Sequence, residues 1–385
     1  MADQNIVGCL RQSDGKVIFT DTECGDLVMP ACINASGEVY VYHENCDGFE
    51  GSDGWYQACL NESGQLQITI PDDCCTLTAW TIITCGTPAS PVHRWDDDGN
   101  ELDSLGPGYE VRNCAVGPGG KFAFVANDYV WVRNVDGSED WTADCHDPTY
   151  GVCFDSNGNV VVVGGRLMYV SNNAVYGNVL KFNSSGTLLW KTKLHADTIM
   201  KGVVCDSNRD VIVTGDDADS DSVWKLDGSD GSELDAYNTG DDTRRIAIDG
   251  SDNVYVTGER ATLDPEAEPV VYSSIWCLDS NLDLNWSVDT GDDTADVDVG
   301  SSYAFVVGDK VGGENLWRLD IADGGNITGI DTPRTNSPAA VAADGSDNVY
   351  ADAYVTGAYK MRKFNSALTL QWTVGARCLG IAYRK

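Results

Sequence analysis

The chain has 385 residues, with 60 Asp and Glu against 25 Lys and Arg, and its formal net charge is −35 at pH 7. This excess of acid excludes a nucleic-acid-binding protein, because that function needs a basic surface, and an anionic membrane surface would repel the chain. The length suffices for two or three average domains, or for one small domain followed by a larger one.

The N-terminus and the cysteine content both bear on where the protein acts. Residues 1–5 show neither the basic start nor the apolar core of a signal peptide, and the most apolar stretch, 77–84, is too short to insert into a membrane. Yet 14 Cys are many for a cytosolic protein. We therefore expect an extracellular protein whose leader has been removed, or a virion component released by lysis.

The first 86 residues contain three similar units, 9–24, 32–46 and 59–74. Each unit begins with Cys and an apolar residue, continues through a Ser-(Asp)-Gly turn into an alternating strand, and ends at Cys. Glycine in the turn allows the positive φ of a tight hairpin, and the alternation turns one strand face inward. The sequence predicts a small domain of β-hairpins over residues 1–86, which would dock the chain to other structural proteins of the same assembly.

Disulfides are the favoured role of the cysteines in this domain, because three hairpins bury little core. The candidates are Cys9, Cys24, Cys32, Cys46, Cys59, Cys74, Cys75 and Cys85, with Cys75 and Cys85 as the fourth pair. The sequence does not choose among the pairings. Reduced, buried thiols are the main alternative, and a metal or iron–sulfur site is a further one, although no C-x-x-C motif is present.

A linker is predicted at 87–91 from its Pro and Ser content, and a second domain at 92–385. In that domain an apolar residue followed by Asp or Asn precedes a turn seven times, at intervals of about 45 residues. The pairs are Trp95-Asp96, Val135-Asp136, Phe182-Asn183, Leu226-Asp227, Leu278-Asp279, Leu319-Asp320 and Phe364-Asn365. This period in a β-rich chain predicts an all-β, seven-bladed propeller.

Each repeat reads as an inner hairpin, such as 245–258, followed by an outer hairpin, such as 179–190. Trp190, Trp286 and Trp372 occupy matched positions, and we expect them to fill the space between blades. The first outer hairpin, near 93–103, has no inner hairpin before it, and the chain ends on a strand-like segment at 378–383. We predict that these two segments pair and close the ring, which leaves no exposed sheet edge.

The segment Asp249–Gly258 resembles the repeat of the bacterial seven-bladed propeller family, whose core is D-x-x-G-N-V-Y-V-T-G, and outer hairpins such as 223–231 resemble the quinoprotein repeat. The resemblance implies a seven-bladed propeller over about residues 92–385 and says little about activity. Quinoprotein dehydrogenases carry a vicinal Cys pair beside the cofactor in a larger propeller. Here Cys74-Cys75 lies outside the repeats, which argues against quinone binding.

Two near-identical acidic loops, 239–243 and 290–294, contain the pairs Asp241-Asp242 and Asp292-Asp293. Both loops lie between one blade's last strand and the next blade's first, so quasi-symmetry places them on one face near the central channel. Converging carboxylates favour Ca²⁺, the only cofactor we expect. The alternative is that Asp simply favours turns. The similar Gly215-Asp216-Asp217 follows an inner strand and is expected to face elsewhere.

Other acidic and thiol-bearing residues have structural interpretations. The Asp-rich hairpins 96–100 and 227–231 lack EF-hand spacing and are interpreted as turns. Four cysteines lie on or beside inner strands and are expected to be buried free thiols: Cys114, Cys153, Cys205 and Cys378.

The favoured function is non-enzymatic, because none of the four His lies in an H-x-x-x-H motif or a recognisable triad setting. We expect a structural or adhesive propeller on a virion, as a phage tail, fibre or decoration protein, or on another extracellular surface. Its loops would contact a cell-surface glycan or receptor. The alternative is a secreted propeller enzyme, either a quinoprotein-like dehydrogenase or one that acts on polysaccharides.

Overall fold

The computed structural model divides the chain into two units, Met1–Ala79 and Trp80–Lys385. It describes residues 8–11, 16–21, 25–33, 39–43, 54–60, 66–68, 81–86, 92–106, 108–167, 177–194, 198–216, 221–264, 271–332, 340–355, 358–376 and 378–384. No helix in these ranges is long and apolar enough to span a membrane.

The first unit contains one antiparallel sheet whose six strands follow one another in chain order. The strands are β1 (Gly8–Arg11), β2 (Lys16–Asp21), β3 (Gly25–Ile33), β4 (Val39–His43), β5 (Gly54–Leu60) and β6 (Leu66–Ile68). The three hairpins expected from the cysteine-framed units correspond to β1–β2, β3–β4 and β5–β6. The disulfide candidates from Cys9 to Cys75 lie outside the residues whose side chains are described.

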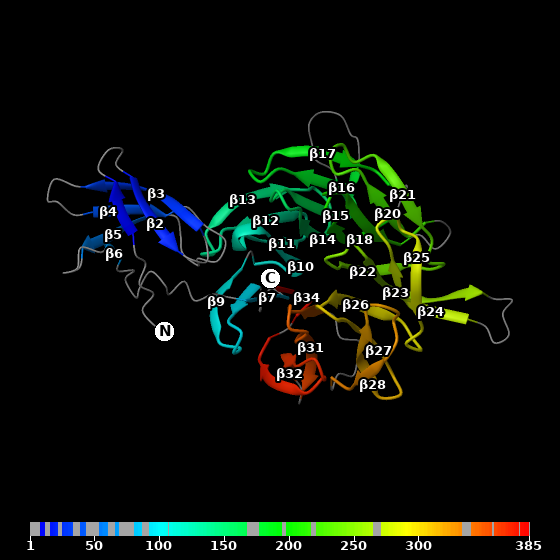
Figure 1. Ribbon diagram of the computed structural model, residues 1–385. Helices are drawn as coiled ribbons and strands as arrows, with labels where there is room; N and C mark the ends of the chain where they lie inside the picture. Colours follow the sequence, from blue (N-terminus) through cyan, green and yellow to red (C-terminus); the bar gives the residue numbers. More distant parts are fainter. Residues whose placement is uncertain are drawn as a thin grey trace. The chain divides into compact units, whose positions relative to one another are not determined.

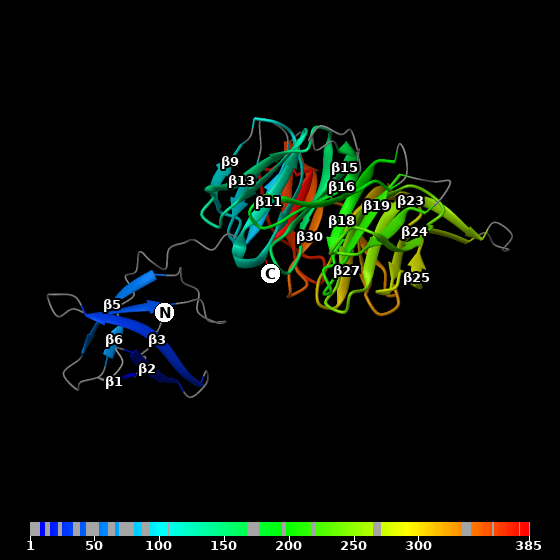
Figure 2. The ribbon, with the colours of Figure 1, turned by 90° about the horizontal axis from the view of Figure 1, so that it is seen from above.

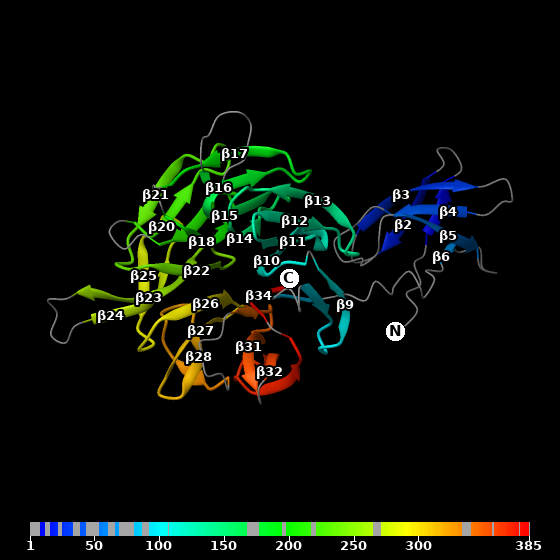
Figure 3. The same ribbon diagram turned by 180° about the vertical axis from the view of Figure 1, so that it is seen from behind.

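The second unit is a seven-bladed β-propeller built from seven four-stranded antiparallel sheets, which confirms the predicted fold. In Figures 1 and 3 innermost strands such as β10, β14, β18, β22 and β26 surround the centre, and outer strands such as β13, β17 and β21 lie at the periphery. Figure 2 shows the blades from the side.

Blades 1 to 4 are made of the following strands. Blade 1 contains β34 (Gly380–Tyr383), β7 (Ile82–Cys85), β8 (Val92–Trp95) and β9 (Glu101–Leu105); blade 2 contains β10 (Val111–Val116), β11 (Phe122–Ala126), β12 (Tyr129–Arg133) and β13 (Glu139–Asp144); blade 3 contains β14 (Thr149–Phe154), β15 (Val160–Leu167), β16 (Gly177–Phe182) and β17 (Leu188–Thr192); blade 4 contains β18 (Met200–Cys205), β19 (Val211–Gly215), β20 (Val223–Leu226) and β21 (Glu233–Tyr237).

Blades 5 to 7 complete the ring. Blade 5 contains β22 (Thr243–Ile248), β23 (Val254–Asp264), β24 (Val271–Leu278) and β25 (Leu284–Val288); blade 6 contains β26 (Thr294–Val299), β27 (Tyr303–Val311), β28 (Glu314–Asp320) and β29 (Thr328–Ile330); blade 7 contains β30 (Val341–Ala343), β31 (Val349–Val355), β32 (Ala358–Phe364) and β33 (Leu370–Val374).

The core lies between the blades. Second strands such as β11 and β19 are buried at every residue, because neighbouring blades cover both of their faces, and they read as continuous apolar runs. The outermost strands β21 and β25 have no buried residue. Each apolar cluster joins two adjacent blades; one cluster, for example, contains Val161 and Trp190 of blade 3 together with Val213 and Trp224 of blade 4.

Ring closure is confirmed, but the predicted partner and domain boundary are wrong. Ile381 of β34 pairs with Thr84 of β7, not with the outer hairpin β8–β9, and blade 1 is therefore complete with four strands. The segment 82–85, which we assigned to the hairpin domain, belongs to the propeller. The predicted linker, residues 87–91, lies outside the residues that the structure describes.

The Asp or Asn of each repeat forms the predicted turn. In the 96–100 hairpin, for example, one carboxylate oxygen of Asp96 accepts hydrogen bonds from the backbone N–H groups of Asp98 and Asn100 at 3.0 and 2.8 Å. In the 227–231 hairpin, Asp227 accepts the N–H of Ser229 at 2.7 Å. The interpretation of both hairpins as turns is confirmed.

Polar contacts between adjacent blades repeat around the ring. The indole N–H groups of Trp190, Trp286 and Trp372 donate to carbonyl oxygens of the next blade at 3.1 Å in each case. These tryptophans lie between blades, as predicted. Lys181 and Lys363, two of the basic residues that precede the repeat's apolar-Asp/Asn pair, reach the same carbonyls of the next blade at 3.0 and 3.3 Å.

Candidate functional site

The innermost strands of all seven blades enclose a central channel of about 520 Å³. The charged lining residues on the innermost strands are Arg245 on β22 and Asp296 and Asp298 on β26. The Arg245 guanidinium crosses to three other blades, where it donates to the carbonyl oxygens of Tyr150 and Lys201 at 3.0 and 2.8 Å and of Arg112 at 3.3 Å. Arg245 therefore ties the inner strands of blades 2, 3 and 4 to that of blade 5.

The two channel aspartates join blade 6 to blade 7. Asp296 accepts the backbone N–H of Val341 at 2.9 Å, and Asp298 accepts that of Ala343 at 2.8 Å. Burial raises the pKa of Asp296 to about 7, and the negative charge of Asp298 adds to the shift; the positive charge of Arg245 and the backbone hydrogen bonds oppose it. The channel thus contains a carboxyl group that titrates near neutral pH.

We expect the Asp296→Asn variant to be more stable than the wild type above pH 7. A carboxyl group with a raised folded pKa contributes stability that is fully present below its unfolded pKa of about 3.9 and is lost as the pH rises through about 7. Asparagine keeps an acceptor for the Val341 N–H but does not ionise. Thermal midpoints of both proteins from pH 5 to pH 8.5 check this, and parallel profiles would contradict it.

The two predicted acidic loops have the same structure. Gly240 and Gly291 have φ angles of 90° and 99°, which explains why glycine stands at both positions. Thr239 Oγ1 donates to the Asp241 carbonyl at 2.8 Å, and Thr290 Oγ1 to the Asp292 carbonyl at 3.2 Å. The loops recur because they shape the entry into an innermost strand.

The final threonine of each loop clamps two blades together. Thr243 Oγ1 lies 2.9 Å from each of the carbonyl oxygens of Gly215 and Ser222 in the preceding blade. Thr294 Oγ1 lies 3.2 Å from the carbonyl oxygen of Gly258 in an equivalent arrangement. Both threonines are completely buried. The repeated T-G-D-D-T sequence therefore has a structural role that is independent of any ligand.

The loops lie on one face, but their aspartates do not line the channel. The described channel lining contains none of Asp241, Asp242, Asp292 and Asp293. Burial raises the pKa of Asp242, and so does the negative charge of Asp216, which shows that Asp216 lies near it. The prediction that Asp216 faces elsewhere is wrong, because loops after second strands and loops before first strands emerge at the same face of an antiparallel blade.

A candidate cation site forms around one loop rather than both. Carboxylate oxygens of Asp292, Asp293 and Asp309 lie within 4.8 Å of one another, whereas Asp241 and Asp242 are in no such group among the described residues. Asp293 also accepts hydrogen bonds from Arg244 at 2.9 Å and from the backbone N–H of Arg260 at 3.0 Å. Three carboxylates suit Ca²⁺, which takes 6–8 oxygen ligands, but Arg244 competes for one of them. The sequence did not indicate Asp309, because it approaches Asp292 and Asp293 only in the folded structure.

Acidic residues outnumber basic ones on this part of the surface, which we call the acidic face. Its eight carboxylates are Asp216, Asp241, Asp242, Glu259, Asp289, Asp292, Asp293 and Asp309, and its three basic side chains are Lys201, Arg244 and Arg260. Arg260 forms a two-point ion pair with Asp289, in which Nε and Nη2 donate to the two carboxylate oxygens at 2.8 and 2.5 Å. None of the eight carboxylates is fully buried.

The remaining candidates from the sequence are cysteines of the propeller. Cys114, Cys153 and Cys378 are buried thiols that form no disulfide, as expected, whereas Cys205, also outside any disulfide, is only half-buried. Cys85 is also a free, buried thiol, located in β7, where it donates to the Gly380 carbonyl at 3.4 Å. The predicted pair of Cys75 and Cys85 is therefore wrong, because Cys85 belongs to blade 1.

Comparisons with known proteins support the fold. No protein-family model matches the chain, and no match was found among curated proteins. Among solved structures, the chain is similar to a protein of unknown function from Desulfotomaculum acetoxidans, with a TM-score of 0.56 and 12% identity over 79% of this chain and 98% of that one.

Two WD40 structures are also similar. The Pan2 WD40 domain of Neurospora crassa has a TM-score of 0.51 and 12% identity, covering 71% of this chain and 81% of that one. The WD40 repeats of RRP9 have the same TM-score and identity, covering 78% of this chain and 88% of that one. At such low identity the similarity establishes that the second unit is a propeller, and nothing about its activity.

Proposed function

We propose that this protein is a non-enzymatic binding propeller that engages a positively charged partner through the acidic face. The observation that carries the proposal is the excess of eight carboxylates over three basic side chains in one group of neighbouring loops. The raised pKa of Asp242, caused first by burial and then by the charge of Asp216, supports it. A cation that binds to such a surface reduces the electrostatic repulsion between its carboxylates.

Two kinds of cation fit this surface. Ca²⁺ fits the group Asp292, Asp293 and Asp309, where it would displace Arg244 from Asp293 and could present open coordination sites to a glycan. A basic segment of a protein receptor fits the wider face, which extends from Asp216 to Asp309. Both partners would bind by charge complementarity. The location of the acidic face supports this, because loops held by a rigid scaffold are the usual place for binding residues.

The proposed setting is a virion or another extracellular surface. The six-stranded sheet of residues 1–79 would attach the chain to its assembly, and the propeller would present its loops to a cell-surface glycan or receptor. The acidic composition supports a solvent-exposed setting, and the cysteine content supports an oxidising one. The chain would belong to the bacterial seven-bladed repeat family that its inner hairpins resemble. Detecting it by mass spectrometry in purified particles tests this setting.

We expect the Asp241/Asp242/Asp292→Asn variant to lose at least tenfold in affinity for a ten-residue oligolysine peptide, and also to bind Ca²⁺ more weakly. Asparagine preserves hydrogen-bond acceptors but removes three charges from the acidic face. Binding of the peptide to the wild type should weaken steeply between about 50 and 200 mM salt, because salt screens the attraction between exposed charges. Isothermal titration calorimetry with each probe measures both effects.

The matched control removes the same charge elsewhere. Asp98, Asp230 and Asp283 are exposed residues of the turns between third and fourth strands, and the Asp98/Asp230/Asp283→Asn variant should bind both probes like the wild type. Equal loss in the two variants would mean that total charge, and not the acidic face, determines binding, and the proposal would fail.

A further inference from the structure

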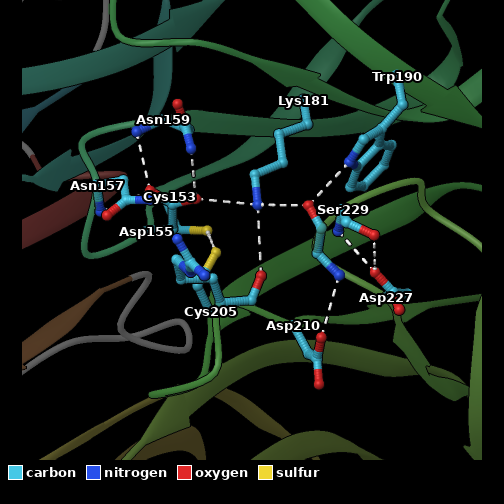
Figure 4. A network of polar contacts seen from close by, with 12 residues as sticks. Cys153, Asp155, Asn157, Asn159, Lys181, Trp190, Cys205, Asp210, Asp227 and Ser229 are labelled. Atoms are coloured by element: carbon cyan, nitrogen blue, oxygen red, sulfur yellow. Dashed lines mark hydrogen bonds and ion pairs between the residues drawn. The ribbon is translucent and has the colours of Figure 1, made fainter.

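The innermost strands of blades 3 and 4 bring two thiols into contact beside the channel. Cys153 lies on β14 and Cys205 is the last residue of β18, and their sulfur atoms are 3.3 Å apart. Figure 4 shows the two sulfurs pointing toward each other. Cys153 is 9% exposed and lines the channel, whereas Cys205 is half-buried.

The contact follows from the symmetry of the ring. Each innermost strand leads into a turn, and Cys153 lies two residues before its turn residue Asp155, whereas Cys205 lies one residue before Asp206. At other blade boundaries the residues at these two positions belong to a shared apolar cluster. The equivalent pairs, each within one apolar cluster, are Ala115 with Phe154, Val204 with Ile248, and Ala247 with Val299. The backbone therefore places the two cysteines opposite each other.

Neighbouring contacts hold this boundary in a fixed geometry. Lys181 of blade 3 donates to the carbonyl oxygens of Arg209 and Gly228 in blade 4 at 3.3 and 3.0 Å, and Trp190 donates to Gly228 at 3.1 Å (Figure 4). A disulfide bond needs the sulfurs about 2.05 Å apart, so they must approach by about 1.2 Å from their present separation.

We propose that Cys153 and Cys205 form a disulfide that links blades 3 and 4 when the protein meets a low-molecular-weight disulfide. The thiolate of Cys205, the more exposed residue, attacks the oxidant's S–S bond, forms a mixed disulfide and releases one small thiol. The thiolate of Cys153 then attacks the Cys205 sulfur, forms the Cys153–Cys205 bond and releases the second small thiol. Two protein thiols are oxidised, one disulfide is reduced, and the two protons end on the released thiols.

The surroundings of the two thiols predict that the disulfide forms slowly and that it stabilises the protein. Burial, together with the neighbouring Cys205, raises the pKa of the Cys153 thiol well above its usual value, so little thiolate is present at neutral pH and the second step accelerates as the pH rises. The bond closes a loop between positions 52 residues apart and restricts the unfolded chain. We expect the thermal midpoint to rise by several degrees.

The experiment uses the full chain incubated with oxidised glutathione, then denatured, alkylated and cleaved before Asp. Cleavage yields peptides 147–154 and 197–205, each with a single cysteine. The expected result is a cross-linked pair of these peptides that disappears on reduction, together with a raised thermal midpoint. Recovery of both peptides in alkylated form, with no cross-linked species at pH 8.5, would overturn the proposal.

Three variants complete the test. Cys153→Ala and Cys205→Ala should each abolish the rise in thermal midpoint produced by the oxidant. Cys277→Ala, which removes a buried thiol of blade 5, should keep both the cross-linked peptide and the rise. If the rise persists in Cys153→Ala, another pair of cysteines causes the stabilisation and the proposed role of this disulfide is refuted. The proposal does not depend on the binding function of the acidic face.

Discussion

A chain that ends at Ala376 is expected to lose about 5 kcal/mol or more of unfolding free energy, and therefore to be largely unfolded at 37 °C. The truncation removes β34 and with it Cys378 and Ile381, both buried. It also exposes Ile82 and Ile83 of β7, which are completely buried in the intact ring. Each such apolar side chain contributes about 1.5–3 kcal/mol, and whole domains are stable by only about 5–15 kcal/mol.

Chemical denaturation followed by tryptophan fluorescence measures this loss, and a chain without Lys385 alone is the control. A synthetic peptide of residues 376–385 should partly restore the cooperative transition when it is added to the truncated chain, because it supplies the strand that pairs with β7. A truncated chain that unfolds at the wild-type midpoint would show that closure through β34 contributes little to stability.

The second large effect is expected at the buried ion pair of Lys181 and Asp155, two residues of blade 3. Lys181 Nζ lies 2.9 Å from a carboxylate oxygen of Asp155, and the two side chains are 2% and 0% exposed. The Lys181→Met variant keeps the length of the side chain but leaves the Asp155 carboxylate buried without its partner. Breaking such a pair costs about 3–5 kcal/mol, and we expect a loss of about 3 kcal/mol in unfolding free energy.

The pH dependence of this loss follows from the pKa of Asp155. Burial alone raises that pKa, but hydrogen bonds from Asn159 and Lys181 and the charge of Lys181 outweigh burial and hold it below its ordinary value. A lowered carboxyl pKa contributes stability that is present above the unfolded value of about 3.9 and is lost as the pH falls through the folded value. The difference between wild type and Lys181→Met should therefore shrink below about pH 4.

Two further variants separate the ion pair from general effects. Lys193→Met changes an exposed lysine near the end of the same blade and should alter the unfolding free energy by less than about 0.5 kcal/mol. The double variant Asp155→Asn/Lys181→Met should be more stable than the sum of the two single losses implies, since the two side chains interact. Strict additivity would show that they do not.

The sequence alone determined the features that depend on neighbours along the chain. The 45-residue period, the turn at each apolar-Asp/Asn pair and the positions of Trp190, Trp286 and Trp372 reflect local turn chemistry and burial, which each repeat specifies by itself. Seven copies therefore predicted seven blades and a closed ring. The positive φ angles of Gly240 and Gly291 are equally local.

Only the tertiary structure decided which distant residues meet. The pairing of Ile381 with Thr84, the position of Asp216 beside Asp242, the addition of Asp309 to Asp292 and Asp293, and the contact of Cys153 with Cys205 all depend on strand direction and on packing between blades. No local signal encodes these contacts, because residues far apart in the chain become neighbours only once the sheets form and the ring closes.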